Sequence, residues 1–289
     1  AYHGSFDALL TLKTNHQTNI ANASIPGITQ SILNESYLFD YGSEESLDFI
    51  KKNKDQIAAV LVEPVQSRNP SFQPIAFLKE LRNITEQNAI ALIFDEIVTG
   101  FRIGLGGCQK LFNINADIVT YGKAIGGGLP IGIVAGTSKY LDAIDGGFWQ
   151  YGDQSIPEVK STFVAGTFCH HPLAMAASLK TLELLDSSKG KILQELNERT
   201  ADFCERMNVF FAENFPKLSI VHFGSLFRFV TPGRYKELYS LLLLNGIYVW
   251  EGRNCFLSVA HTSEVIELLE DKIKLSCNQL IEFGIINPK

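Results

Sequence analysis

The sequence predicts an α/β fold with a mostly parallel sheet, helices on both faces and a small C-terminal α+β domain. Two short apolar runs, Ile90–Phe94 and Ile118–Tyr121, are bounded by polar or glycine residues, as buried parallel strands are. Helical and strand patterns alternate around them in the rhythm of βαβ units. From about Ser219 the pattern changes to short strands around helices. We therefore expect a large domain over residues 1–188, followed by a long linking helix and the small domain over residues 189–289.

The large domain is expected to begin with loop and short extended pieces, because residues 1–40 are rich in Asn, Ser, Thr and Gly and show little periodicity. Beyond this segment, amphipathic or apolar runs and their proline boundaries predict the elements. The predicted helices are Glu44–Asn53, Pro74–Asn88 and His171–Leu185, and the remaining strands are Ile57–Val62 and Ile131–Ala135. The segment 146–162, with Phe148, Trp149 and Tyr151, is expected to be irregular.

The small domain is predicted from shorter patterns. The linking helix is expected over Lys189–Asn214, and the pattern leaves open whether it is broken. A second helix is expected over Arg234–Asn245, and a final one from Ser263 to about Phe283. The predicted strands are Ser219–Phe223, Phe227–Val230, Ile247–Val249 and Cys255–Ser258.

Composition excludes several classes of protein. Of the 289 residues, 46% are hydrophobic and 19% charged, as in an ordinary globular protein, and the net charge of −6 argues against a nucleic-acid surface. No apolar run reaches the length of a membrane span, and the opening residues do not predict a signal peptide. Five cysteines without CxxC spacing are typical of reduced thiols in the cytoplasm. The start at Ala1 predicts a segment of a longer protein.

Each of the two central strands ends at one charged residue, Asp95 in the first and Lys123 in the second. Ligands bind at the ends of neighbouring strands in open α/β sheets, so this acid and lysine form a candidate catalytic pair. Partial desolvation among glycines would make Lys123 nucleophilic enough for a Schiff base. Asp95 would suit a protonated pyridine nitrogen, because a buried carboxylate needs a cationic partner. An ordinary surface lysine and an ordinary helix N-cap are the alternatives.

Other motifs are weaker when each is taken alone. Tyr2 could stack on a planar ring or be a plain buried tyrosine, and Thr167 precedes a helix whose N-terminus could bind phosphate or simply start the helix. The pair His170-His171 lacks a third ligand with sensible spacing, so no metal site is expected. Lys123 is not in a Walker P-loop, since Ala124 follows it where that motif needs Ser or Thr.

The order of these motifs resembles that of class III, fold type I aminotransferases, which use pyridoxal 5'-phosphate (PLP), and of glutamate-1-semialdehyde aminomutases in particular. The resemblance runs from end to end of this chain. It rests on Tyr2-His3-Gly4, Glu63-Pro64-Val65, the run from Asp95 to Arg102, the run from Gly122 to Gly128, Gly166-Thr167 with residues 172–176, and Ser258–Thr262.

This resemblance implies a PLP site built on the strand ends. Lys123 would hold the cofactor as a Schiff base and then shuttle protons at the substrate carbon. Asp95 would pair with the pyridinium nitrogen and keep the ring an electron sink.

The resemblance also implies the surroundings of the ring. Tyr2 would stack on one face with His3 beside it, and Ile97 would pack against the other face. Thr167 would reach the phosphate held by the neighbouring subunit, so a homodimer with shared active sites is expected. The family's long N-terminal portion, which grips the phosphate, does not precede Tyr2 in this chain.

Several residues differ from the aminomutase pattern around the substrate. Arg68 stands where relatives have Glu or Asn, and Val98 stands where many have Gln. The runs Glu63–Arg68, Gly146–Asp153 and Trp250–Arg253 resemble the aminotransferase domains of hybrid polyketide/non-ribosomal-peptide synthetases of the mycosubtilin and microcystin type. Arg68 and Arg253 are the candidate substrate-binding residues.

That subgroup implies a specific reaction. An amino donor such as glutamate would supply the amino group, and a β-keto acyl thioester on a carrier protein would accept it. A free-standing glutamate-1-semialdehyde aminomutase or amino-acid transaminase is the alternative within the same chemistry. An inactive fragment of the fold is the non-enzymatic alternative.

Overall fold

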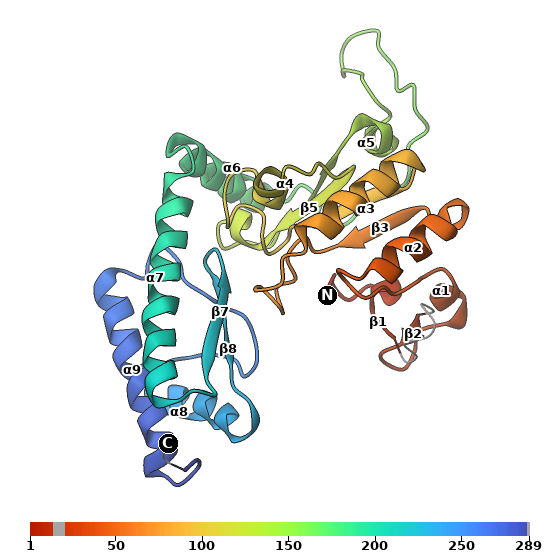
Figure 1. Ribbon diagram of the computed structural model, residues 1–289. Coiled ribbons are helices and arrows are strands. Elements are labelled where there is room, and N and C mark those ends of the chain that lie inside the picture. Colours follow the sequence, from red (N-terminus) through yellow and green to blue (C-terminus); the bar gives the residue numbers. More distant parts are fainter. Residues whose placement is uncertain (14–20, 288–289) are drawn as a thin grey trace.

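The computed structural model, which describes residues 1–13 and 21–287, contains a four-stranded sheet at the centre of the larger part (Figure 1). Its strands stand in the order β3 (Ala59–Val62), β4 (Ala91–Asp95), β5 (Ile118–Gly122) and β6 (Gly132–Gly136). β3, β4 and β5 are parallel, whereas β6 runs antiparallel to β5. This arrangement confirms the predicted mostly parallel sheet.

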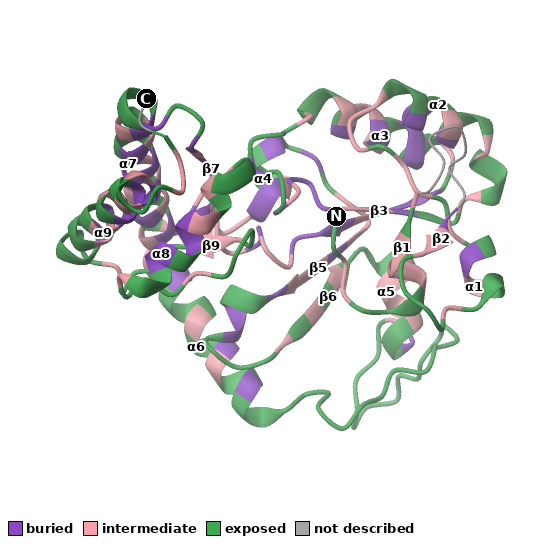
Figure 2. Ribbon diagram, turned by 90° about the horizontal axis from the view of Figure 1, so that it is seen from below, coloured by how far each residue is buried: buried purple, intermediate pink, exposed green. Residues whose placement is uncertain are grey.

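Helices lie on both sides of this sheet (Figure 2). α2 (Glu44–Lys52) and α3 (Ile75–Gln87) cover one side, and α6 (Pro172–Ser187) lies on the other. The buried faces of α2 and α3 pack with the strands in one core, which includes Leu78, Leu81 and Phe94. These elements agree with the predicted ones to within about two residues at each end.

Three short helices were not predicted. They are α1 (Gln30–Asn34), α4 (Gly107–Phe112) and α5 (Ser138–Asp145). Each has eight residues or fewer, so each is too short to show a helical period in the sequence. The N-terminal region otherwise has the expected short extended pieces, β1 (Thr11–Leu12) and β2 (Asn22–Ala23). The part of that prediction that falls on residues 14–20 lies outside the described residues.

The C-terminal part contains a three-stranded antiparallel sheet and three helices beside it. The elements are α7 (Lys191–Asn214), β7 (Ser219–Phe223), β8 (Leu226–Val230), a 3-10 turn η4 (Gly233–Glu237), α8 (Leu238–Leu244), β9 (Cys255–Phe256) and α9 (Ser263–Glu282). α7 is a single unbroken helix. The helix expected from Arg234 is a 3-10 turn at first and becomes α-helical at Leu238.

The strand predicted at Ile247–Val249 is wrong. This segment has no regular secondary structure, and its Ile247 N–H donates to the Leu242 carbonyl at 2.8 Å, which closes the end of α8. Ile247 and Val249 nevertheless pack against the hydrophobic core of the C-terminal part. The apolar alternation therefore reports burial of these side chains rather than pairing with a neighbouring strand.

Two hydrophobic cores organise the described chain. One lies among α2, α3 and the parallel strands, and the other among α7, α8, α9 and the antiparallel strands. Phe223 at the end of β7 joins the first core, where its ring lies 6.5 Å from that of Phe112.

The domain boundary between residues 188 and 189 stays a prediction. No described helix is long and apolar enough to cross a membrane.

The segment between α5 and α6 forms a long loop that extends away from the sheet (Figure 1). It contains no helix or strand, in agreement with the irregular segment expected at 146–162. Phe148 is 96% exposed and Tyr151 is 98% exposed. These aromatic side chains therefore contribute nothing to the core of this chain.

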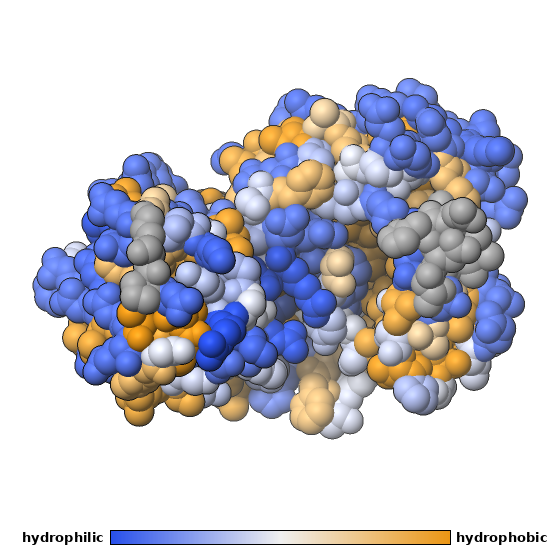
Figure 3. Space-filling view, turned by 60° about the horizontal axis from the view of Figure 1, so that its bottom comes forward, coloured by the Kyte–Doolittle hydropathy of each residue, from blue (hydrophilic) through white to orange (hydrophobic). Residues whose placement is uncertain are grey.

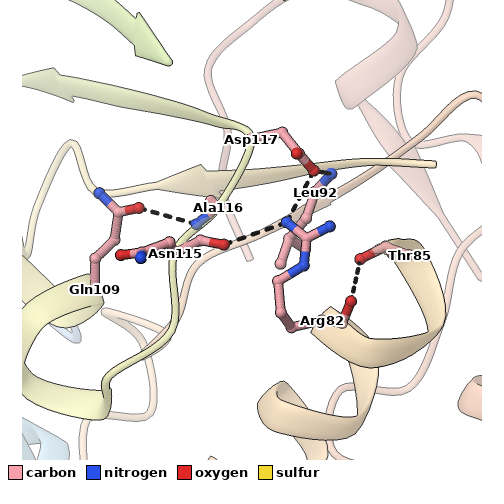
Figure 4. A network of polar contacts seen from close by, with 7 residues as sticks. All are labelled: Arg82, Thr85, Leu92, Gln109, Asn115, Ala116 and Asp117. Carbon is pink, nitrogen blue, oxygen red and sulfur yellow. Dashed lines mark hydrogen bonds and ion pairs between the residues drawn. The ribbon is translucent and has the colours of Figure 1, made fainter. Parts of the chain in front are cut away.

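Asp117 fixes the strands at the edge where β5 begins (Figure 4). Its Oδ2 accepts the Leu92 N–H at 2.8 Å and lies 2.9 Å from Nη1 of Arg82 on α3. Arg82 Nη1 also donates to the Asn115 carbonyl at 3.2 Å. One carboxylate thus ties α3 and β4 to the start of β5 and holds the register of the two strands.

Replacement of Asp117 by Ala is expected to lower the free energy of unfolding by about 2–4 kcal/mol. The change leaves the Leu92 N–H without its acceptor, and the largely buried Arg82 guanidinium keeps only the Asn115 carbonyl and loses its charged partner. Asp117→Asn should cost less, because its amide oxygen still accepts both bonds. Urea denaturation of the three proteins measures the effect, and equal stability of Asp117→Ala and the unmodified chain would contradict this role.

Candidate functional site

Three parallel strands end at the same edge of the sheet, and each delivers a charged residue there. Glu63 directly follows β3, Asp95 is the last residue of β4, and Lys123 directly follows β5. In the register of the sheet, Val62 pairs with Phe94 and Asp95 pairs with Thr120. Since neighbouring strands are about 4.8 Å apart, two carboxylates and one ammonium share this edge. The opposite edge is the one held by Asp117.

Asp95 is 8% exposed, and both of its carboxylate oxygens have partners. Oδ2 lies 2.7 Å from Nδ1 of His3, and Oδ1 accepts the Ile97 N–H at 3.0 Å. No helix starts at Asp95. Residues 97–102 form turns, and the next α-helix, α4, begins at Gly107. The alternative of an ordinary helix N-cap is therefore wrong, and the carboxylate is held rigidly at the strand end.

Lys123 adopts a left-handed backbone conformation with φ of 48°, which is uncommon for a residue other than glycine. The side chain keeps exposed surface, yet partial burial lowers the pKa of its ammonium, because the charged form loses hydration. The negative charges of Asp95 and Glu63 oppose this shift, and Arg102 adds to it. Lys123 is therefore an exposed lysine whose ammonium lies in the field of two carboxylates and one guanidinium, and its role as the cofactor lysine stays a prediction.

Two glycines near Lys123 lie in close contacts. A Cβ at Gly122 would be a tight 3.1 Å from the Ile97 side chain, and a Cβ at Gly127 would lie 2.7 Å from Thr181 Oγ1 on α6, which leaves no room for it. Gly127 also has a φ of 60°, which L side chains rarely adopt. Ile97 thus packs beside the backbone of Lys123, and the glycine loop rests directly on α6.

Glu96 has a structural role although it adjoins Asp95. It is fully buried, and its carboxylate accepts the N–H groups of Cys108 and Gln109 and the hydroxyl of Thr99. These two N–H groups open the first turn of α4, where a negative charge is favourable. Burial still raises the pKa of Glu96. This carboxylate anchors α4 and is turned away from the strand edge.

Tyr2 and Arg68 lie next to each other. The Arg68 guanidinium carbon is 6.0 Å from the centre of the Tyr2 ring, and Tyr2 is 54% exposed. Because His3 bonds Asp95, these two residues lie beside the strand edge, where Figure 1 places the N-terminus near the end of β3. A buried Tyr2 is therefore excluded within this chain.

The structure does not bring Arg253 or Thr167 to Lys123. Arg253 stacks on Trp250, with its guanidinium carbon 4.8 Å from the ring centre, in the C-terminal part of the chain. Thr167 is exposed in a turn shortly before α6. Neither residue has a described contact with Asp95, Glu63 or Lys123. Their roles stay predictions.

Two residues near Lys123 were missed by the sequence reasoning, Arg102 and Glu63. Arg102 donates from Nε to the Val98 carbonyl at 3.0 Å and from Nη1 to Ser225 Oγ at 3.3 Å. Its guanidinium carbon lies 4.3 Å from the centre of the Phe256 ring, and burial lowers its pKa to about 10. Arg102 therefore joins the strand edge to the antiparallel sheet.

The surface between the two parts of the molecule is hollowed, and hydrophilic residues gather in the hollow (Figure 3). Arg102 on the larger part and Ser225 on the C-terminal part are joined by a hydrogen bond. Arg102 and Glu63 could have been found from the sequence only because they lie in the motifs that carry the family resemblance. No local pattern shows which charged residues a fold will bury.

Among the described residues, no three His, Cys, Asp or Glu side chains are grouped as metal ligands.

Comparison with known proteins agrees with this geometry. Residues 1–259 match the family described as aminotransferase class-III. Glutamate-1-semialdehyde 2,1-aminomutase of Methanosphaera stadtmanae is 30% identical over 296 residues, which cover 97% of this chain and 67% of the relative. The enzyme of that name from Francisella tularensis subsp. holarctica is also 30% identical, over 92% of this chain and 63% of the relative. The chain thus spans about two thirds of the length of these relatives.

Solved structures give the same picture. A transaminase with PLP bound superposes on 99% of this chain with a TM-score of 0.83 at 25% identity, and 67% of that structure is covered. An omega-transaminase from Sphaerobacter thermophilus covers 96% of this chain with a TM-score of 0.81 at 24% identity, and 66% of that structure is covered. Together these matches show that the chain belongs to the class-III aminotransferase family, enzymes of fold type I whose cofactor is PLP.

Proposed function

We propose that this protein is an aminotransferase that uses PLP to move an amino group from an amino-acid donor to a keto acceptor. The observation that carries the proposal is the placement of Asp95 and Lys123 at the adjacent ends of β4 and β5. Family membership supports the proposal, because it makes this edge the place where the cofactor is expected.

The residues at the strand edge fit PLP. Asp95 is a buried carboxylate held by His3 and the Ile97 N–H, so it suits a positively charged ring nitrogen. Lys123 has an amine whose pKa is lowered by burial, so it suits attachment to an aldehyde. When bound, PLP supplies that aldehyde and an electron-withdrawing ring. By the family resemblance, Ile97, which lies beside Gly122, and Tyr2 would pack against the two faces of the ring.

Lys123 would also carry the proton that amino transfer requires at the substrate carbon. A lysine suits this task when its pKa is close to neutral, because the amine must both take and give the proton. Desolvation moves the pKa of Lys123 in that direction. His3 would keep the Asp95 carboxylate oriented while this happens.

Replacement of Lys123 by Ala is expected to abolish covalent attachment of PLP. The protein is mixed with PLP, reduced with borohydride and digested, and mass spectrometry then locates the adduct. The unmodified chain should carry it on the peptide that contains Lys123, and Lys180→Ala, an exposed lysine on α6, should behave like the unmodified chain. An adduct absent from the unmodified chain, or one that persists in Lys123→Ala, would contradict the assignment and favour an inactive fragment.

For the acceptor we propose a β-keto acyl thioester held on a carrier protein, with glutamate as the type of donor. The support is the sequence resemblance of three runs, together with the position of Arg68 beside Tyr2. A cation at that position suits a carboxylate of the glutamate donor. Arg253, in the third of these runs, is the second candidate for such a contact.

The alternative acceptor is glutamate 1-semialdehyde. The identity of 30% to proteins named as aminomutases favours it. Arg68 argues against it, because the corresponding aminomutase residue is neutral.

The two acceptors can be separated by direct assay of the protein loaded with PLP. We expect a β-keto acyl thioester on a carrier protein to be aminated, with glutamate as donor, with a specificity constant about 100-fold above that for glutamate 1-semialdehyde, because the longer acyl chain buries apolar surface that glutamate 1-semialdehyde lacks. Arg68→Asn should reduce this ratio. Rapid conversion of glutamate 1-semialdehyde with no amination of the thioester would establish the alternative.

We also propose a homodimer in which Thr167 serves the phosphate of the partner's site. Thr167 is exposed and lies between Phe163 and Phe168, which are 91% and 81% exposed. Exposed aromatic residues that flank a polar residue are typical of an interface.

Replacement of Phe168 by Asp is expected to raise the dissociation constant of the dimer about 100-fold, since two aromatic side chains lose their buried apolar contact. Sedimentation velocity over a range of concentrations measures it. Leu244→Asp, which changes an exposed leucine on α8, should leave the constant unchanged. A protein that is monomeric at high micromolar concentration would rule out the shared site.

A further inference from the structure

Glu63 stands out among the buried carboxylates because one of its oxygens has no partner. The residue is 4% exposed. Oε1 accepts the Ser67 N–H at a long 3.4 Å, whereas Oε2 is buried and has no hydrogen bond to any part of the chain that the structure describes. A buried charged oxygen without a donor has lost its hydration and gained no hydrogen bond in return. Such an atom calls for a functional explanation.

Neighbouring carboxylates show that the fold can satisfy such groups. Both oxygens of Asp95 have partners, and Glu96 has three donors around it. Glu63 follows β3 directly at the same strand edge, beside the strand that ends at Asp95. Tyr41 also lies near this carboxylate: its hydroxyl donates to the Pro64 carbonyl at 2.7 Å, and its pKa is raised by burial, with smaller contributions from Cys108 and from the charge of Glu63.

The charged groups that act on the Lys123 amine are Asp95, Glu63 and Arg102. His3 Nδ1 lies 2.7 Å from Oδ2 of Asp95, so one oxygen of that carboxylate is already engaged by His3. Arg102 is directed to Ser225 and Phe256 on the antiparallel sheet. Of the two carboxylates that act on Lys123, Asp95 has partners for both oxygens, whereas Oε2 of Glu63 has none among the described residues.

We propose that Glu63 is a positioning residue for Lys123 whose buried, unpartnered oxygen stabilises the protonated form of that amine. The carboxylate thus controls how strongly Lys123 holds the proton that amino transfer requires. This inference rests on the proposed function for its purpose, but the electrostatic effect exists in the protein without cofactor. Glu63 acts through Lys123 and contacts no reacting atom itself.

The test is Glu63→Gln, measured on the cofactor-free protein. The variant keeps an amide oxygen for the Ser67 N–H and removes only the charge. Acetic anhydride labels neutral amines, so mass spectrometry of the Lys123 peptide over a range of pH gives the pKa of this amine. Loss of a negative neighbour disfavours the ammonium, so the pKa of Lys123 should fall by about 0.5–1 unit. At a pH below both midpoints, labelling of Lys123 should rise about 3- to 10-fold.

Two further variants separate charge from structure. Asp117→Asn removes the same charge at the opposite edge of the sheet, where β5 begins, and should leave the labelling curve of Lys123 unchanged. Glu63→Asp keeps the charge and should return the curve toward that of the unmodified chain. A labelling curve for Glu63→Gln that coincides with the unmodified one, or an equal shift in Asp117→Asn, would overturn the proposal.

A second measurement uses the protein loaded with PLP. The absorbance of the bound cofactor changes with protonation of its bond to Lys123, and the midpoint of that change should also move to lower pH in Glu63→Gln. Failure of PLP to attach to the unmodified chain would count against the proposed function alone. Failure of the cofactor-free labelling to shift would count against Glu63 alone.

Discussion

The desolvated edge where three parallel strands end is the constraint on which the rest of the structure depends. Burial there favours neutral groups, yet the chain places Glu63, Asp95 and Lys123 at that edge. The charges are tolerable because they have opposite signs and because His3 bonds Asp95. The same desolvation brings the pKa of Lys123 toward the range in which an amine can react and exchange protons.

The remainder of the larger part holds this edge in place. At the opposite edge, Asp117 ties the start of β5 to β4 and α3, so the register that aligns Asp95 with Lys123 is fixed far from the chemistry. Glu96 secures α4, and Gly127 lets the loop after Lys123 rest on α6. Rigid support matters because a site works only when its groups keep their geometry.

Arg102 links the reactive edge to the antiparallel sheet through Ser225 and Phe256. The position of the C-terminal part is therefore coupled to the electrostatics around Lys123. Thr167 and the aromatic residues beside it have no such link among the described residues and remain exposed. In the proposed homodimer they would serve the partner's site, whereas Asp95, Glu63 and Lys123 come together within one copy of the chain.

The sequence by itself predicted the strands of a mostly parallel sheet and placed Asp95 and Lys123 at the ends of two of them, because buried strands are apolar runs whose ends are marked by polar residues. It did not determine α1, α4 and α5, which are too short for a period, and it produced a false strand at Ile247–Val249 from apolar alternation. Only the tertiary structure decided that His3 bonds Asp95, that Glu63 keeps an oxygen without a donor and that Arg102 bridges two sheets. Such contacts join residues far apart in the chain, and no local pattern records which of them burial will bring together.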